Sequence, residues 1–205
     1  MYATQVIKGL LQGPDLAQVQ AWVAQYDSTH DVVPAPIGHY IGVSPQVDAM
    51  LNSLIDCVPG ERLFIRILEA TSPGGPHADN GLPQPLPPDY PIPNWGRTFI
   101  IPLTTQETHT VIFNQSLPPG VSVSEHIDRL PLLDPRQSVG QVTAQQYLTH
   151  TGRPWLDRLS IDCIFPWHAG DMLVFDRSRI HCSDNWTSSG IDVKRGFVIW
   201  SEIHL

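Results

Sequence analysis

The sequence has few cysteines, no long apolar run and little positive charge. Its three cysteines, Cys57, Cys163 and Cys182, form no CxxC pair, so they indicate neither a disulfide framework nor a thiolate zinc site. No stretch of about 18 apolar residues occurs, and Met1–Gln12 lacks a secretory hydrophobic region. The 12 Lys and Arg residues against 20 Asp and Glu leave a net charge of −8, which disfavours nucleic acid and membrane partners. We therefore predict a cytoplasmic protein that binds neither.

Proline and histidine, by contrast, are abundant, with 20 and 9 copies in 205 residues. Eight of the prolines lie between Pro73 and Pro93, and because proline fixes φ and lacks an N–H donor, this segment is predicted to be a semi-rigid extended loop. The length and the 41% hydrophobic content fit one compact domain over residues 1–205. No internal domain boundary is evident.

Helical patterns come first in the chain and strand patterns follow. Apolar residues at helical spacing predict a helix over Asp15–Tyr26, and Ser44-Pro45 opens a second one, giving a helical support over about residues 1–58. Five runs rich in β-branched and aromatic residues predict strands: Arg62–Ala70, Arg97–Leu103, His109–Gln115, Asp171–Asp176 and Lys194–Ile203. Shorter strands are predicted at Val121–Val123 and Ile161–Phe165, and a short helix within Thr143–Arg158. This order predicts a mainly β fold with flanking helices, an antiparallel sandwich or barrel with its core over about residues 61–203.

A histidine and an aspartate follow the first long strand in the tripeptide His77-Ala78-Asp79. Residues two apart on an extended chain point to the same side, so both side chains can reach one ion. His181 comes 104 residues later, and closure of a sandwich could return it to the same place. Two histidines and one carboxylate on one face of a metal are typical of non-haem Fe(II) oxygenases.

Two cations lie just downstream, because Lys194 and Arg195 begin the last predicted strand, 13 and 14 residues after His181. A dicarboxylate cosubstrate that chelates iron at one end needs a cation for its buried far carboxylate. The sequence therefore offers a candidate pair for such a ligand.

Four segments together resemble the Fe(II)/2-oxoglutarate-dependent oxygenases, in particular the prolyl-4-hydroxylase-like branch. They are RLFIRILEATSPGGPHAD, RTFIIPL, AGDMLVFDRSRIHCSDNW and KRGFVIW, and they extend over about Glu61–Ile203. The resemblance implies a double-stranded β-helix, or jelly roll, with Fe(II) held by His77, Asp79 and His181 and with 2-oxoglutarate and O2 as cosubstrates. It implies hydroxylation of a substrate C–H bond with release of succinate and CO2. An aspartate at position 79 favours hydroxylation over halogenation.

The resemblance also suggests which residues hold the cosubstrate. In this branch the basic residue often lies six positions before an aromatic on the same strand face, a relation that joins Lys194 to Trp200 and slightly favours Lys194. The opposite register would place Arg195 inward, where its planar guanidinium group could pair bidentately with a carboxylate. The usual hydroxyl partner later in this strand is missing, and Thr98 is a candidate substitute.

The substrate is expected on the side of the proline-rich loop, where Tyr90, Trp95 and Arg97 are candidate contacts. A peptidyl proline, a free amino acid and another small metabolite all stay open as substrates. Two other functions also stay open: a cupin-type metal enzyme that does not use 2-oxoglutarate, and a non-enzymatic jelly-roll binding protein.

Overall fold

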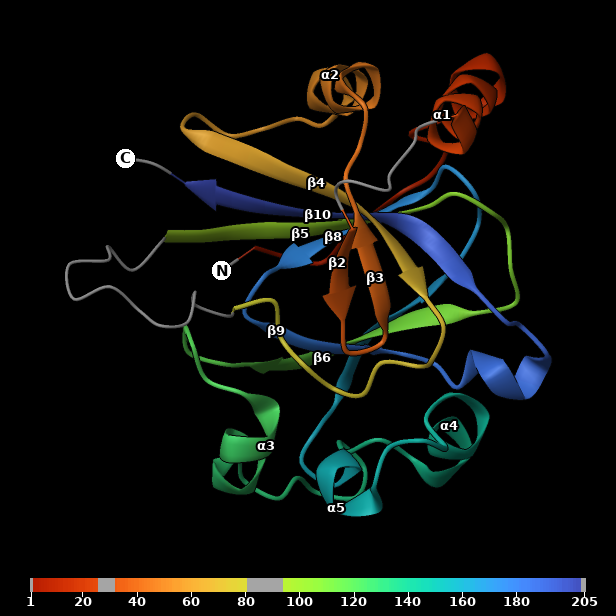
Figure 1. The fold of residues 1–205 in the computed structure, drawn as a ribbon. Coiled ribbons are helices and arrows are strands. Elements are labelled where there is room, and N and C mark those ends of the chain that lie inside the picture. The colour runs from red at the N-terminus through yellow and green to blue at the C-terminus, as the bar shows by residue number, and fades with distance from the viewer. Residues whose placement is uncertain (1, 26–31, 81–93, 204–205) are drawn as a thin grey trace.

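Two facing antiparallel sheets form the centre of the molecule, with helices on both outer sides (Figure 1). The structure is a computed structural model that describes residues 2–25, 32–80 and 94–203. The larger sheet contains, in spatial order, β1 (Gln5–Ile7), β8 (Met172–Asp176), β5 (Asn94–Pro102), β10 (Lys194–Ile203), β4 (Glu61–Ala70), β3 (Gly38–Ile41) and β2 (Val32–Ala35). The smaller sheet contains β7 (Ile161–Pro166), β6 (His109–Ser116) and β9 (Arg179–Ser183).

The connections between the strands are those of a jelly roll. After β5 in the larger sheet the chain forms β6 and β7 in the smaller one, and then β8, β9 and β10 alternate between the two sheets. An isolated antiparallel bridge between His77 and His181 places the segment after β4 beside β9, as a fourth element of the smaller sheet. The predicted mainly β fold with flanking helices, a double-stranded β-helix, is confirmed.

Strand β10 shows how the alternating sequence sets the two faces of the larger sheet. It pairs with β4 over all ten of its residues. Phe197 and Ile199 face the outer core beneath the helices, whereas Val198 lines a cavity between the sheets. Because successive side chains on a strand point to opposite faces, Lys194 is on the inner face with Val198. The inner apolar layer itself consists of Ile100, Ile112, Phe165, Trp167, Leu173 and Phe175.

Two helices cover the outer face of the larger sheet, α1 (Gly13–Gln25) and α2 (Pro45–Leu54) (Figure 1). Helix α2 begins as predicted, because the Ser44 hydroxyl accepts a hydrogen bond from the Val47 N–H and Pro45 occupies the first turn. The described part of α1 ends at Gln25. The N-terminal region also contributes β1, β2 and β3 to the sheet, which the sequence did not indicate.

Three short helices cover the smaller sheet: α3 (Val123–His126), α4 (Gln141–Tyr147) and α5 (Arg153–Leu156). The strand predicted at Val121–Val123 is wrong, because Ser122 and Glu125 form a capping box that starts α3. The single helix predicted within Thr143–Arg158 is two helices, since Gly152 ends the intervening turn and caps α5. Among the helices of the described ranges, none combines the length and apolar character of a membrane span.

Candidate metal centre and the adjoining cavity

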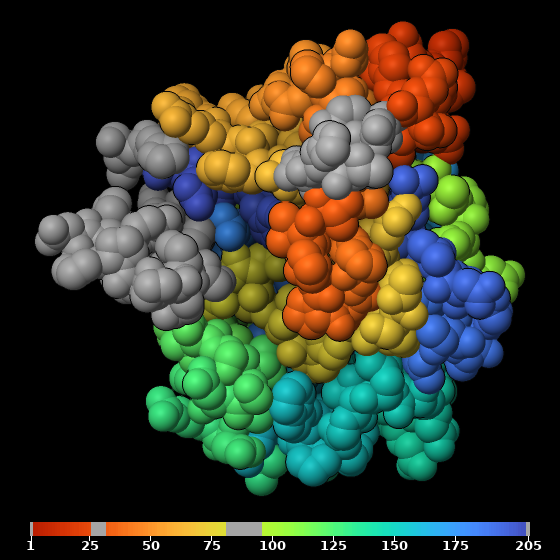
Figure 2. Space-filling model, in the orientation of Figure 1, coloured from red at the N-terminus to blue at the C-terminus, as the bar shows by residue number. Residues whose placement is uncertain are grey.

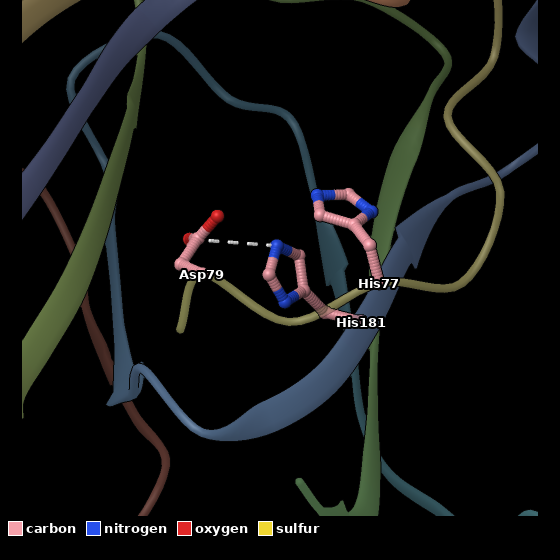
Figure 3. Close-up of side chains that lie close together, drawn as sticks. All are labelled: His77, Asp79 and His181. Carbon is pink, nitrogen blue, oxygen red and sulfur yellow. Dashed lines mark ion pairs between the residues drawn. The ribbon is translucent and has the colours of Figure 1, made fainter. Parts of the chain in front are cut away.

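Backbone pairing brings His77 and His181 together from distant parts of the chain. The His77 N–H donates to the His181 carbonyl at 2.9 Å, and the His181 N–H donates to the His77 carbonyl at 2.8 Å. Two residues on, the Asp79 N–H donates to the Arg177 carbonyl at 3.0 Å. The segment of residues 77–79 therefore runs beside β9, and its two side chains meet His181, as Figure 3 shows.

The two imidazoles present free Nε2 atoms. His77 Nδ1 lies 2.8 Å from the Gly75 carbonyl oxygen, and His181 Nδ1 lies 3.1 Å from that of Arg179. A carbonyl only accepts hydrogen bonds, so each Nδ1 carries a proton, and Nε2 is the ring nitrogen left to bind a metal. A backbone carbonyl behind Nδ1 is the usual support of a metal-binding histidine.

Asp79 supplies the third donor atom and is held in place from behind. Its Oδ2 lies 3.6 Å from His181 Nε2 and accepts a 2.8 Å hydrogen bond from the Thr98 hydroxyl. Burial raises the pKa of Asp79, but His181, His77, the Thr98 hydroxyl and Arg177 together outweigh burial and hold it below the ordinary value. The carboxyl group is therefore ionised at neutral pH.

The last member, His181, is fully enclosed and neutral. Burial lowers its pKa to about 4, and the neighbouring His77 adds to this effect. One donor atom from each of His77, Asp79 and His181 lies within 4.8 Å of the other two. Two imidazoles and one carboxylate fit a divalent transition metal, and the three residues predicted from the sequence to share a site are together in the structure.

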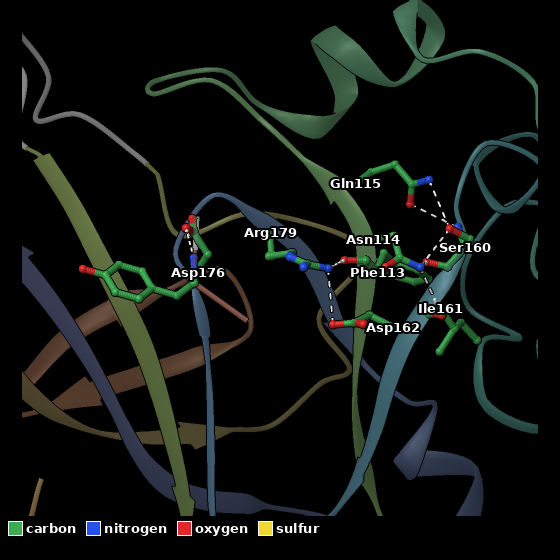
Figure 4. Close-up of polar contacts among 9 residues, drawn as sticks. Phe113, Asn114, Gln115, Ser160, Ile161, Asp162, Asp176 and Arg179 are labelled. Atoms are coloured by element: carbon green, nitrogen blue, oxygen red, sulfur yellow. Dashed lines mark hydrogen bonds and ion pairs between the residues drawn. The ribbon is translucent and has the colours of Figure 1, made fainter. Parts of the chain in front are cut away.

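Strand β9 is anchored at its first residue, two positions before His181. The Arg179 guanidinium donates to the Phe113 carbonyl at 3.2 Å and lies 3.3 Å from Asp162 Oδ2, so it ties β9 to β6 and β7 (Figure 4). Next to it, the Asn114 and Gln115 side chains bond Ser160 (Figure 4). Because the Arg179 carbonyl holds His181 Nδ1, this network fixes the strand that orients the imidazole.

The three candidate metal ligands line a cavity between the two sheets, and Lys194 lines the same cavity. Among the described residues that line it, Lys194 is the only lysine or arginine. Its side chain is buried, and Nζ donates to the His109 carbonyl at 3.0 Å. Burial lowers the pKa of Lys194 to about 7, against the opposing effects of Asp184 and Cys182. The cavity thus joins a metal-type donor set to a buried ammonium group.

The three other residues predicted to hold a cosubstrate do not line the cavity. Arg195 faces the other side of β10, where its Nε is 2.8 Å from Glu69 Oε1 at a half-exposed position. Trp200 is not among the residues lining the cavity and instead packs edge-on against Tyr40, at 5.1 Å between ring centroids. Thr98 bonds Asp79 and is likewise not a lining residue.

The structure describes the predicted substrate contacts only in part, and of these Arg97 is not among the residues lining the cavity. Tyr90 lies outside the described ranges. Trp95 is near the start of β5, where it pairs with Glu202. The Arg97 guanidinium bonds the Glu61 carboxylate and the Asp56 carbonyl, so it has a structural role at the outer face.

Three residues of the cavity wall were missed at the sequence level: Thr110, Trp167 and Tyr40. The Trp167 indole N–H donates to Thr110 Oγ1 at 2.9 Å, deep between the sheets. Thr110 shares the inner face of β6 with Ile112, and this alternation could have revealed a hydroxyl inside the barrel. Tyr40 gave no such signal because its strand was not predicted.

The hairpin of β2 and β3 lies across the front of the barrel (Figures 1 and 2). Its turn residue Ile37 lines the cavity, and the Ile37 carbonyl accepts from the Thr71 N–H at 2.8 Å. Tyr40, on β3, lines the cavity beside Asp79, and burial together with this carboxylate raises the pKa of its phenol. The hairpin therefore forms one wall of the site and keeps a neutral phenol next to it.

Solved structures share this fold, although no protein-family model matches the sequence and no match was found among curated proteins. The carbocyclase SnoK from nogalamycin biosynthesis is 15% identical, with a TM-score of 0.58 over 98% of this chain and 80% of that chain. The epimerase SnoN, in complex with Fe3+, alpha ketoglutarate and nogalamycin RO, is 17% identical, with a TM-score of 0.53 over 98% and 79%. A 2OG-Fe(II) oxygenase family oxidoreductase from Burkholderia pseudomallei is 14% identical, with a TM-score of 0.51 over 98% and 85%. At the level of the fold, the structure thus confirms the resemblance to this family.

Proposed function

We propose that this protein is an Fe(II)- and 2-oxoglutarate-dependent dioxygenase that hydroxylates a C–H bond of a small-molecule or peptide substrate. The observation that carries the proposal is the meeting of His77, Asp79 and His181 in one cavity with buried Lys194. The similar solved structures with bound iron and ketoglutarate support the choice of ligands. Fe(II), 2-oxoglutarate and O2, when bound, would supply the oxidising chemistry that releases succinate and CO2.

The chain's own residues hold and orient these groups. His77 Nε2, His181 Nε2 and one Asp79 oxygen would bind the metal on one side, which leaves the opposite side for ligands. The Lys194 ammonium would pair with the far carboxylate of 2-oxoglutarate, since it is the one lysine or arginine among the described lining residues. The Thr110 hydroxyl accepts from Trp167 and still has its own proton to donate to that carboxylate.

Other residues exclude water and keep the site dry. Phe175 packs edge-on against the His181 ring at 4.8 Å between centroids, and the apolar side chains of Ile100 and Val198 line the cavity. Exclusion of water strengthens the ionic contact of a carboxylate with Lys194. The primary substrate would approach the metal from the exposed side of His77, because His77 also lines a second groove beside Trp155.

Anaerobic titration tests the proposal directly. Metal-free protein mixed with Fe(II) and 2-oxoglutarate without O2 is expected to show a weak visible charge-transfer band. Substitution of His77, Asp79 or His181 by alanine should remove the band while the circular dichroism spectrum stays unchanged. His168→Ala is the matched control, since His168 is half exposed in the turn before β8 and should leave the band intact.

A spectrum identical to that of the metal-free protein would overturn the proposal. Stoichiometric metal binding without any effect of 2-oxoglutarate would favour a cupin-type enzyme instead, and absence of metal binding would favour a jelly-roll binding protein. A screen for substrates that stimulate succinate release, over proline-containing peptides, amino acids and small metabolites, would then identify the substrate class.

A further inference from the structure

An aromatic ring lies directly beneath the ammonium group of Lys194. The Nζ atom is 4.0 Å from the centroid of the Trp167 ring, and both residues are buried, with 3% and 2% of their surfaces exposed. A cation over the face of an indole is attracted by the ring's negative quadrupole, and the attraction is stronger where water is excluded. The contact therefore stabilises the charged form of Lys194, which burial disfavours.

The indole is fixed from two sides. Its Nε1–H donates to the Thr110 hydroxyl at 2.9 Å. On β10, Gly196 leaves room for the ring, because a Cβ at that position would lie 3.1 Å from Trp167 Cη2. The same Cβ would lie 3.0 Å from the Ile101 carbonyl oxygen, so a side chain at position 196 would crowd both the strand and the ring, and glycine accommodates the indole without this crowding.

The remaining contacts of Nζ leave donors available for a ligand. An ammonium group has three N–H donors, and one of them is used by the His109 carbonyl at 3.0 Å. The ring beneath the ammonium group and the carbonyl beside it restrict where the other two donors point. Both groups line or adjoin the cavity that holds the candidate metal ligands.

We propose that Trp167 is a positioning residue for the cosubstrate, whose indole face stabilises the Lys194 ammonium group and directs it toward the far carboxylate of 2-oxoglutarate. The proposal rests on the function proposed above. It predicts that the electrostatics of the ring, and not only its shape, set the affinity for a dicarboxylate.

Fluorinated tryptophans separate the electrostatic effect of the ring from the effect of its shape, because fluorine withdraws electron density from the ring face with little change in shape. We would place mono-, di- and tetrafluorotryptophan at position 167 of the full chain and load the protein with Zn(II), so that binding is measured without turnover. Calorimetry at pH 8 would give the dissociation constants of 2-oxoglutarate and of 2-oxobutyrate, a keto acid without the far carboxylate. The dissociation constant of 2-oxoglutarate is expected to rise with each increase in the number of fluorine atoms, and to be about 10-fold higher for the tetrafluoro ring. The 2-oxobutyrate constant is expected to stay constant.

The control protein carries the same fluorinated tryptophans at position 22, on α1, and keeps the native Trp167. It should bind 2-oxoglutarate with the affinity of the wild type. Trp167→Phe keeps a ring face and should lose less affinity for 2-oxoglutarate than Trp167→Leu. If the wild type prefers 2-oxoglutarate and fluorination at position 167 does not change this preference, the role of Trp167 is overturned while the proposed function stands. If the wild type binds both keto acids equally, the assignment of Lys194 and the role of Trp167 are overturned together.

Discussion

The affinity for 2-oxoglutarate should fall as the pH rises, because its proposed partner Lys194 loses a proton near neutrality. Burial lowers the pKa of Lys194 to about 7, whereas an exposed lysine stays charged to about 10.4. The carboxylate of the ligand needs the ammonium form. Binding above pH 7 must therefore include the free energy of protonating Lys194.

The size of the effect follows from this pKa. If the bound lysine stays protonated, the apparent dissociation constant is multiplied by 1 + 10^(pH − pKa), and with a pKa of about 7 this factor is about 1 at pH 6 and about 100 at pH 9. Asp184 and Cys182 face Lys194 and act on its charge. His109 pairs with Asp184 through a 2.8 Å contact and is a further titratable neighbour.

Anaerobic titration of Fe(II)-loaded protein with 2-oxoglutarate, followed by the charge-transfer band from pH 6 to pH 9, measures this dependence. Lys194→Arg is the control, because a guanidinium stays charged over the range while His109 and the metal ligands are unchanged. At each pH, the ratio of the wild-type dissociation constant to that of Lys194→Arg gives the contribution of Lys194 protonation. Lys194→Met should bind about 100-fold more weakly at pH 6. Identical pH profiles for the wild type and Lys194→Arg would refute the reasoning.

Three further substitutions test the site and the core. Thr98→Val removes the hydroxyl that bonds Asp79, and zinc affinity, measured by competition with a chelator, should fall about 10-fold, whereas unchanged affinity would contradict a role in holding the carboxylate. Arg195→Gln breaks only the half-exposed ion pair with Glu69, so we expect the dissociation constant of 2-oxoglutarate to stay within about twofold of the wild type. A larger loss of affinity would favour Arg195 over Lys194 as the cation that pairs with the cosubstrate. Phe197→Ala opens a hole in the fully buried core under the helices, and urea unfolding should show a loss of about 3–5 kcal/mol; a loss below about 1 kcal/mol would mean that this core repacks.

Local sequence patterns were sufficient for the central strands and for the candidate metal ligands. Strands β4, β6 and β10 are rich in β-branched and aromatic residues, so their existence followed from residue type alone. The spacing of His77 and Asp79 placed both side chains on one side of an extended segment. Edge strands β1 and β2 escaped prediction because nearly all their residues are exposed, which removes the alternation that marks a half-buried strand.

The sequence by itself determined the kind of fold, the donor types of the site and the pair of cations at the start of β10. Only the tertiary structure decided which of those cations lines the cavity, because the pairing of β10 with β4 and β5 sets which strand face is turned into the barrel. It also decided that Thr98 supports Asp79 and that Thr110 and Trp167 adjoin Lys194. These contacts join residues about 20 to 85 positions apart in the chain. Residues so far apart meet only when the two sheets close on each other, and a local sequence pattern does not indicate such contacts.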